Sequence, residues 1–290
     1  MLDQTAVWQC PSCQTPLNFE NKQWRCLHNH CFDSAKEGYV NLLLAQNKKS
    51  KAPGDSNDMI NARRVFLEKG YYQPLAQKIA EILISDVSLE DTYAVFDAGC
   101  GEGYYLNYVA QNLQQHGLRC SFQGVDISKP AIQKAAKRYK DYQFAVASTF
   151  DLPISDHSQN AVFQIFAPSS AQEVSRVLVE NGLWITVNPA PNHLQELKAL
   201  VYDAPEQHDI STEVPAGFIG EHHENLTFTF QLEDPIARES LLMMTPFYWR
   251  ISEQKKAEVL NTLEAVTADF DIRVYRPSSA NELKGSTGSN

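Results

Sequence analysis

Four cysteines and two histidines crowd into the stretch CPSCQTPLNFENKQWRCLHNHCFD, as Cys10, Cys13, Cys26, His28, His30 and Cys31. Structural Zn²⁺ sites take four thiolate or imidazole ligands, often as two close pairs joined by a dozen or so residues. Cys10 and Cys13, with two residues between them, make a first pair. The second pair is Cys26 with either His30 or Cys31. The spacing predicts one structural zinc ion and leaves its fourth ligand open.

Free thiols and disulfides are the competing interpretations of these cysteines. The segment before Cys10, MLDQTAVWQ, has no apolar run of the kind that starts a signal peptide, so we expect a reducing, cytoplasmic compartment. A metal site therefore fits better than a disulfide. No stretch approaches the ~20 apolar residues that cross a bilayer, so no membrane span is expected. The net charge of −10 argues against indiscriminate nucleic-acid binding.

A second chemical motif follows an apolar run in VFDAGCGEGYY, where Asp97 precedes Gly99, Gly101 and Gly103. A glycine turn between strand and helix lets a ligand approach the backbone closely at the carboxyl edge of an α/β sheet. Asp97 can attract the cationic methionine end of S-adenosylmethionine. Asp126 ends the next apolar run, GVD, where a carboxylate can accept hydrogen bonds from both ribose hydroxyls. The motif therefore predicts an S-adenosylmethionine site.

A nicotinamide cofactor is the alternative for this loop. The dinucleotide fingerprint needs a third glycine where this chain has Tyr104, so the loop fits a nicotinamide cofactor poorly.

Enzymes that methylate exocyclic amines are expected to carry an Asn/Asp-Pro-Pro-aromatic tetrapeptide. The corresponding segment here reads IFAPSS, which argues against adenine N6 or cytosine N4 as the target. Cys100 and Cys120 lie in or beside apolar strands without a neighbouring base, so we expect structural cysteines. No catalytic base is identifiable from the sequence.

The elements that must position these residues alternate between strand and helix. Strands are predicted around 94–101, 121–128, 142–148, 161–168 and 182–190, and helices at 59–70, 71–84, 104–117, 129–140 and 171–182. This alternation implies an α/β fold with parallel strands and helices on both faces. Two later runs, 224–234 and 270–277, are predicted to complete the sheet as an antiparallel pair.

Composition shifts divide the chain into four parts. We expect a zinc-binding domain over residues 1–47, a basic linker over 48–58, the α/β domain over 59–280 and a disordered tail over 281–290. The segment 46–58, QNKKSKAPGDSND, which contains this linker, is rich in Lys, Ser, Pro, Gly and Asp and has no apolar periodicity.

Together the motifs resemble the bacterial 23S rRNA (guanine-N1)-methyltransferases of the RlmA (RrmA) type. The resemblance covers most of the chain and is carried by CPSC, CLHNHCFDSAKEGYVNLL, PGDSNDMINARRVFLEKGYYQP, DAGCGEGYY, VDISKPAIQKAAKRY, PNHLQELK and MTPFYWR. It implies a small zinc-ribbon domain that recognises RNA, joined to a class I (Rossmann-like) methyltransferase domain that binds S-adenosylmethionine. The implied substrate is a guanine in a hairpin loop of domain II of 23S rRNA. PGDSNDM favours the proteobacterial type.

The resemblance also implies the site residues. The zinc ligands fall on Cys10, Cys13, Cys26 and His30, since His28 and Cys31 stand where the family can carry residues that do not bind metal. With Asp97, Gly99 and Asp126 from the motif itself, the implied cofactor contacts are Tyr72, Gly101, Glu102 and His193. Ser148 stands where an acid often contacts the adenine amine, so adenine recognition is expected to rest on backbone groups. A homodimer is also implied.

Three functions remain open at this point. The first is the rRNA guanine-N1 methyltransferase. The second is a class I methyltransferase of a small molecule such as a quinone precursor, which the zinc ribbon and basic linker disfavour. The third is a non-catalytic zinc-ribbon RNA-binding protein. For the first, aromatic and basic side chains of the ribbon and linker are the expected RNA contacts: Trp24, Arg25, Lys36, Lys48, Lys49 and Lys51.

Overall fold

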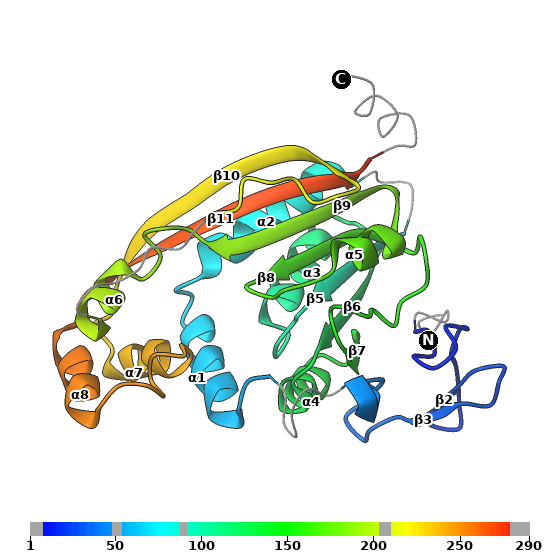
Figure 1. Ribbon diagram of the computed structural model, residues 1–290, viewed down its shortest axis with the longest axis horizontal. Coiled ribbons are helices and arrows are strands. Elements are labelled where there is room, and N and C mark those ends of the chain that lie inside the picture. The colour runs from blue at the N-terminus through cyan, green and yellow to red at the C-terminus, as the bar shows by residue number, and fades with distance from the viewer. Residues whose placement is uncertain (1–7, 48–53, 88–91, 203–209, 279–290) are drawn as a thin grey trace.

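The computed structural model describes residues 8–47, 54–87, 92–202 and 210–278. Within these residues the chain forms a three-stranded sheet and an eight-stranded sheet. Figure 1 shows the small sheet at one end of the molecule and the large sheet running across its centre, with helices around it. Lys48, Lys49 and Lys51, and the tail at 281–290, lie outside the described residues.

The small sheet is an antiparallel ribbon in the order β1-β2-β3, formed by Asn18–Glu20, Gln23–Arg25 and Cys31–Asp33. Its first hairpin turns through Asn21 and Lys22, whose φ angles are +51° and +63°. Two consecutive left-handed residues make the two-residue turn whose twist matches antiparallel strands, and asparagine tolerates that conformation best after glycine. The sequence therefore specifies a tight hairpin between the two cysteine pairs.

The large sheet has the strand order β10-β11-β9-β8-β5-β6-β7-β4. Its strands are β4 (Val40–Asn41), β5 (Tyr93–Ala98), β6 (Cys120–Asp126), β7 (Gln143–Val146), β8 (Gln159–Ile165), β9 (Leu178–Pro189), β10 (Phe218–Gln231) and β11 (Ala265–Pro277). Strands β4 to β9 pair in parallel, and β11 pairs antiparallel with both β9 and β10. The α/β class and the antiparallel pair at the end of the sheet are confirmed.

Eight α-helices lie in the described residues: α1 (Asn57–Glu68), α2 (Gln73–Asp86), α3 (Tyr104–Gln115), α4 (Lys129–Arg138), α5 (Ala171–Val177), α6 (Gln195–Val201), α7 (Pro235–Met243) and α8 (Glu253–Thr262). A short 3₁₀ helix, η1, covers Ala45–Asn47. Helix α1 begins two residues before the predicted start, because the Ser56 side chain accepts a hydrogen bond from the Met59 amide and caps it.

Alternate residues of the central strands feed two separate cores, as the two-residue period of a strand requires. In β5, Val95 packs into the core that holds the apolar stripes of α2, α3 and α4, whereas its neighbour Phe96 packs into the core that holds α5. Both side chains are fully buried. The sheet is thus covered on both faces, as a class I methyltransferase sheet requires.

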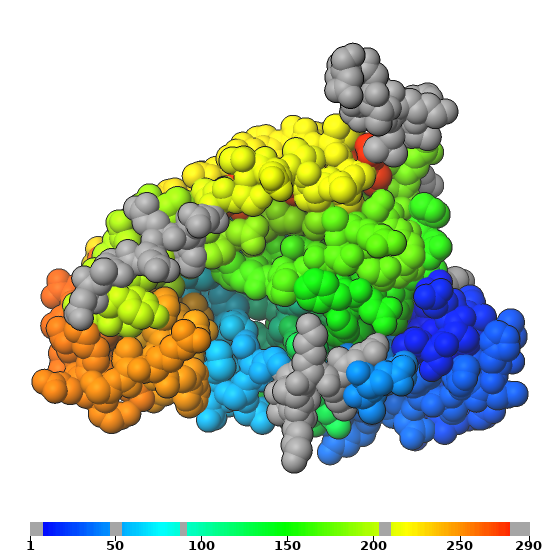
Figure 2. All heavy atoms as spheres, in the orientation of Figure 1, coloured from blue at the N-terminus to red at the C-terminus, as the bar shows by residue number. Residues whose placement is uncertain are grey.

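The ribbon is packed onto the large domain. Trp8 is 1% exposed, forms an antiparallel bridge with Ile154 and shares one hydrophobic core with Phe96 and Val162. Strand β4, within the predicted zinc domain, pairs in parallel with β7 and so adds an edge strand to the large sheet. Figure 2 shows the ribbon (blue) as a lobe against one side of the large domain, with α7 and α8 (orange) on the opposite side.

Some expected elements differ from those observed. The helix predicted over 171–182 ends at Val177, and β9 begins at Leu178 and carries the following residues as strand. Helices α7 and α8 were not predicted. No helix among the residues described is both long and apolar enough to cross a membrane.

Candidate metal centre and cofactor site

Cys10, Cys13, Cys26 and His30 come together at the base of the ribbon, with their ligand atoms all within 4.8 Å of one another. The Sγ atoms of Cys13 and Cys26 are 3.7 Å apart, and Nδ1 of His30 lies 3.4 Å from Sγ of Cys26 and 3.5 Å from Sγ of Cys10. A tetrahedral Zn²⁺ with bonds of about 2.0–2.3 Å spaces its ligand atoms by roughly 3.4–3.8 Å. The donor set and its spacing fit a structural zinc ion.

This grouping resolves the choice that the spacing left open. Cys31 and His28 are not members of the cluster; Cys31 is exposed on β3, where its Sγ lies 3.9 Å from a guanidinium nitrogen of Arg25. Trp24 was expected to contact RNA, but its ring is only 6% exposed and packs against Phe19, so it offers no free face to a base. Arg25 and Lys36 do face solvent.

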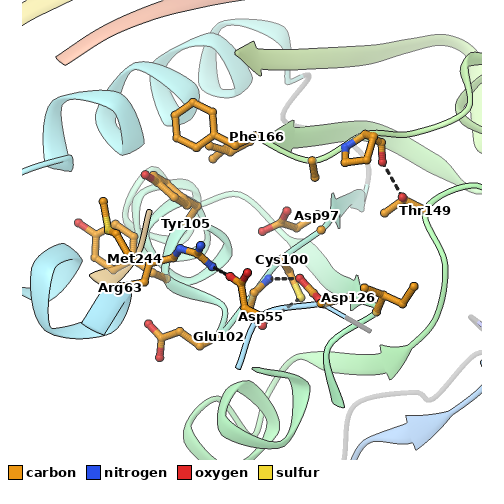
Figure 3. Close-up of a pocket in the computed structure, with 18 of the residues that line it drawn as sticks. Asp55, Arg63, Asp97, Cys100, Glu102, Tyr105, Asp126, Thr149, Phe166 and Met244 are labelled. Carbon is orange, nitrogen blue, oxygen red and sulfur yellow. Dashed lines mark hydrogen bonds and ion pairs between the residues drawn. The ribbon is translucent and has the colours of Figure 1, made fainter. Parts of the chain in front are cut away.

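A cavity of about 520 Å³ opens at the carboxyl ends of β5, β6 and β8, where the strand order changes direction. Open α/β sheets bind ligands at this switch point. The cavity wall includes every residue that the sequence proposed for the cofactor: Tyr72, Asp97, Gly99, Gly101, Glu102, Asp126 and His193. Ser148 lines it too. In Figure 3 Glu102 and Asp126 lie in the lower part of the view, Asp97 lies near its centre, and Phe166 lies above them.

The glycine loop fits tightly between β5 and α3. Gly99 has a φ of +97°, and a Cβ built there would lie 2.4 Å from Cβ of Ala167, so only glycine can occupy this position. The Gly101 amide donates a 2.9 Å hydrogen bond to Oδ2 of Asp126. The end of β6 therefore holds the loop that follows β5.

Asp126 is fixed through both carboxylate oxygens. Oδ2 accepts the Gly101 amide, and Oδ1 accepts the Ser128 amide at 2.7 Å. Burial raises the pKa of Asp126 above its ordinary value, and the two amide hydrogen bonds oppose that rise. Each carboxylate oxygen has two lone pairs, so each retains capacity for a ligand hydroxyl.

Two further acids in the cavity are held in dry surroundings. Asp97 is 2% exposed, and burial, followed by repulsion from Asp126, raises its pKa well above its ordinary value. Burial raises the pKa of Glu102 to about 7, against the attraction of Arg138 and Arg64, each 4.0 Å from Oε2. Neither carboxylate oxygen of Glu102 has a hydrogen-bond partner among the described residues. Such carboxylates favour a cationic or hydrogen-bond-donating ligand.

Tyr72 and His193 form the opposite wall. The Tyr72 hydroxyl lies 3.4 Å from Nε2 of His193, and both side chains are buried. Phe270 touches both rings, at centroid distances of 5.1 Å from Tyr72 and 5.0 Å from His193. An aromatic layer therefore connects the residue that precedes α2, the segment before α6, and β11.

Two segments of the chain match known families. Residues 8–51 match the family model described as RlmA, N-terminal, and residues 89–262 match a methyltransferase domain model. The chain is 30% identical over 279 residues to the 23S rRNA (guanine(748)-N(1))-methyltransferase of Streptomyces fradiae, with 93% of this chain and 96% of that protein covered. The chain belongs to the RlmA family of 23S rRNA (guanine-N1)-methyltransferases.

Other relatives carry names of the same reaction class. The YxjB protein of Bacillus subtilis (strain 168) is 30% identical over 277 residues, covering 93% of this chain and 96% of that protein. A protein of Micromonospora griseorubida is 34% identical over 209 residues, covering 65% of this chain and 68% of that protein. These relatives come from Gram-positive bacteria, not from proteobacteria.

As a member of the RlmA family, the chain has a zinc ribbon and an S-adenosylmethionine-dependent methyltransferase domain. The cavity fits that cofactor by its donor set. A buried acid with a raised pKa, Asp97, suits the positive sulfonium and ammonium groups, and the two held oxygens of Asp126 suit a pair of ribose hydroxyls. The left-handed Gly99 lets a ligand lie directly against the backbone.

Several residues of the cavity were not predicted from the sequence. Gly54 and Asp55, within the linker, form part of the cavity wall: the Asp55 carbonyl accepts a 3.0 Å hydrogen bond from the Ser128 hydroxyl, and its carboxylate pairs with Arg63. Met244, Thr245 and Pro246, which follow α7, form another part of the wall. Their segment, MTPFYWR, was noted only as part of the resemblance, and no residue type in it signals a cofactor.

Proposed function

We propose that this protein transfers the methyl group of S-adenosylmethionine to N1 of a guanine in a hairpin loop of domain II of 23S rRNA. The observation that carries the proposal is that the zinc site and the cofactor cavity belong to one packed unit. The zinc ribbon, a typical platform for structured RNA, is packed into the same sheet whose carboxyl edge holds the cofactor cavity.

The roles of the residues follow from the geometry. Asp126 would hold the ribose hydroxyls, Asp97 would face the cationic end of the methionine part, and Gly99 and Gly101 would let the cofactor lie on the loop. Tyr72 and His193 would close the cavity against water from the opposite wall. Bound here, the cofactor supplies an electrophilic methyl group. The contribution of the protein is to hold N1 of guanine in line with it at about 3–3.5 Å.

The target base must leave its stack to reach the cavity. A guanine inside a paired helix hides N1 in a Watson–Crick hydrogen bond, whereas a hairpin-loop guanine is turned out at low cost. Among the expected RNA contacts, the exposed Arg25 and Lys36 on the ribbon support this assignment, because they supply positive charge for loop phosphates.

The experiment that tests this function uses purified protein, labelled S-adenosylmethionine and 23S rRNA from cells that lack the modification. We expect a single N1-methylguanosine, mapped by mass spectrometry of nuclease fragments to one guanine of the domain II hairpin. Cofactor binding without transfer to this RNA, together with turnover of a small molecule, would contradict the proposal. Binding of RNA without any cofactor binding would favour a non-catalytic RNA-binding protein.

The finer features of the proposal rest on the family resemblance. The proteobacterial type is supported by PGDSNDM and decides which loop guanine is modified, so the mapped position tests it directly. A homodimer would have about twice the 32.7 kDa of one chain, which light scattering measures. A ribosomal RNA substrate favours a cytoplasmic location. Residues 1–47 are proposed as the RNA-recognition domain, 48–58 as its linker and 59–280 as the methyltransferase domain.

A further inference from the structure

A second cavity of about 860 Å³ adjoins the cofactor cavity. The two share wall residues, including Phe166, His193, Leu194 and Thr245. The second cavity extends from this shared wall toward β9, β11 and the helix α6. A molecule bound in the second cavity would therefore lie next to the cofactor, and the shared residues would contact both.

The shared wall carries two exposed aromatic rings. Phe150 is 57% exposed and Phe166 is 43% exposed, and both line the second cavity as well as the cofactor cavity. Phe166 also has a left-handed backbone, with a φ of +54°, and its amide donates a 2.9 Å hydrogen bond to the Val187 carbonyl. A bulky residue adopts this conformation rarely, and such strain tends to persist where it places a side chain for function. Figure 3 shows Phe166 at the edge of the cofactor cavity.

One cationic side chain that lines the second cavity, Lys198, has no hydrogen-bond partner among the described residues. Lys198 lies on α6 one helical turn after Leu194 and is 5% exposed. Burial lowers its pKa. The other charged residues that line this cavity are either paired or exposed. Arg273 pairs with Asp271 at 2.8 Å, and Glu213 faces solvent. Burying an unpaired ammonium is costly, so the site is built for an anionic or strongly accepting oxygen.

We propose that this second cavity, here named the acceptor cavity, receives the target guanosine, with Phe166 against the base and Lys198 on an anionic oxygen of the nucleotide. The inference rests on the proposed function and names its substrate site. Aromatic rings stack on turned-out bases, and a lysine supplies a point charge for oxygen anions.

The anionic oxygen that Lys198 would contact has two possible sources, the base and the phosphate of the target nucleotide. In the methyl transfer, the N1 electron pair forms the new bond to carbon, the carbon–sulfur bonding pair returns to sulfur, and the N1 proton passes to water. Loss of that proton places negative charge on N1 and O6 of the base. Lys198 would then stabilise O6, or it would hold a phosphate oxygen of the same nucleotide.

The test compares full-length wild-type protein with Lys198→Met, Lys198→Arg and Phe166→Leu on a 23S rRNA domain II transcript. Lys78→Met is the control, because Lys78 lies on α2 away from both cavities and pairs with Glu224. Binding of S-adenosylmethionine, measured by calorimetry, should remain within about twofold of wild type for Lys198→Met, Lys198→Arg and Lys78→Met, because neither lysine lines the cofactor cavity. We expect Lys198→Met to lose tenfold or more in methylation, with partial recovery in Lys198→Arg.

The pH profile separates the two sources of the oxygen. If Lys198 stabilises O6, the single-turnover rate of Lys198→Met falls most at neutral pH and recovers as rising pH deprotonates N1 without help. If Lys198 holds a phosphate, the KM for RNA rises at every pH, the rate at saturating RNA stays near wild type, and the salt dependence of binding weakens. Phe166→Leu should raise the KM for RNA by about fivefold or more.

Two outcomes overturn the inference. A fully active Lys198→Met variant, with both KM and rate within twofold of wild type, removes Lys198 from the acceptor cavity and leaves the proposed function intact. A wild-type protein that binds the cofactor yet methylates no RNA overturns the proposed function and the acceptor cavity together.

Discussion

The hydroxyl of Tyr72 lies 3.4 Å from Nε2 of His193, across 121 residues of sequence. The other ring nitrogen, Nδ1, lies 3.2 Å from the backbone amide of Asp269. An amide N–H can only donate, so Nδ1 accepts and the neutral ring carries its proton on Nε2. In this tautomer His193 points a donor at Tyr72, which is a poor arrangement for removing the N1 proton of guanine.

His193 should therefore act as a fixed donor, and its two amide replacements should differ. His193→Gln places an amide nitrogen near the position of Nε2 and should keep cofactor affinity within about threefold. His193→Asn mimics Nδ1 only and should weaken binding by about 0.5–1.5 kcal/mol, the usual worth of one neutral hydrogen bond. Calorimetry with S-adenosylmethionine measures both. Equal losses in the two variants would show that Nε2 does not matter.

Asp97 should make the cofactor-free protein less stable at neutral pH. Its folded pKa is raised above the ordinary 3.8, so its stabilising contribution is complete below 3.8 and is lost as pH rises through the folded value. Asp97→Asn removes this loss. The melting temperature of the variant should therefore exceed that of wild type by a margin that grows as the pH rises above 3.8.

The same substitution should weaken cofactor binding. A positive ligand prefers the ionised acid, so wild-type affinity for S-adenosylmethionine should increase with pH until Asp97 is fully ionised. Losing a hydrogen bond to a charged group costs about 1.5–3 kcal/mol, or roughly tenfold or more in Kd. A variant with higher stability and unchanged affinity would remove Asp97 from the cofactor contacts.

Local chemistry made much of the site predictable. The cysteine spacing indicated a metal, the glycine loop and Asp126 indicated the cofactor edge, and the alternation of strands and helices indicated the sheet. These signals are local in sequence, so a residue type and its spacing carry them. Tyr72 and His193 came from the family resemblance alone, because nothing near either residue shows that the two rings will meet.

What the sequence did not indicate depends on contacts distant in the chain. The short strand β4 becomes an edge of the large sheet only because β7 offers a parallel partner. Helix α5 stops at Val177 because the following residues extend β9 beside β8, where tertiary pairing overrides a helical pattern. Asp55 reaches the cavity through contacts with Ser128 and Arg63, which no local pattern encodes.

Glu102 should make the folding stability of the protein depend on pH between about 4.5 and about 7. Its folded pKa of about 7 lies above the ordinary 4.5, so its contribution to stability is complete below pH 4.5 and is lost as pH rises to about 7. At about 1.4 kcal/mol per pH unit the loss is at most about 3–4 kcal/mol. Glu102→Gln should flatten this part of the profile.

Thermal or denaturant unfolding between pH 4.5 and pH 8 measures the effect. Glu81→Gln, on the exposed side of α2, is the matched control, because the Glu81 side chain is 52% exposed. Its profile should follow wild type. A Glu102→Gln profile that also follows wild type would mean that Glu102 is not held in the dry environment described above.

Zinc removal should abolish RNA methylation while leaving most cofactor binding intact. The ribbon shares its buried apolar side chains with the core of the large domain, so the metal bonds should supply much of the free energy that orders the ribbon strands. The cofactor cavity is lined by other elements. Deleting residues 1–47 is a poor substitute for this experiment, since it would also strip β4 from the sheet and uncover the core beneath Trp8.

The sharper test changes one ligand at a time. His30→Ala should lose the metal, measured as zinc per chain, and with it methylation of 23S rRNA, whereas the Kd for S-adenosylmethionine should stay within about threefold of wild type. His30→Cys keeps four ligands and should retain zinc and activity, because a four-cysteine site is equally suitable for Zn²⁺. Cys31→Ser should behave as wild type, since Cys31 lies outside the cluster. If His30→Ala kept full RNA methylation, the ribbon would not be the RNA platform, and the substrate would have to be recognised by the large domain alone.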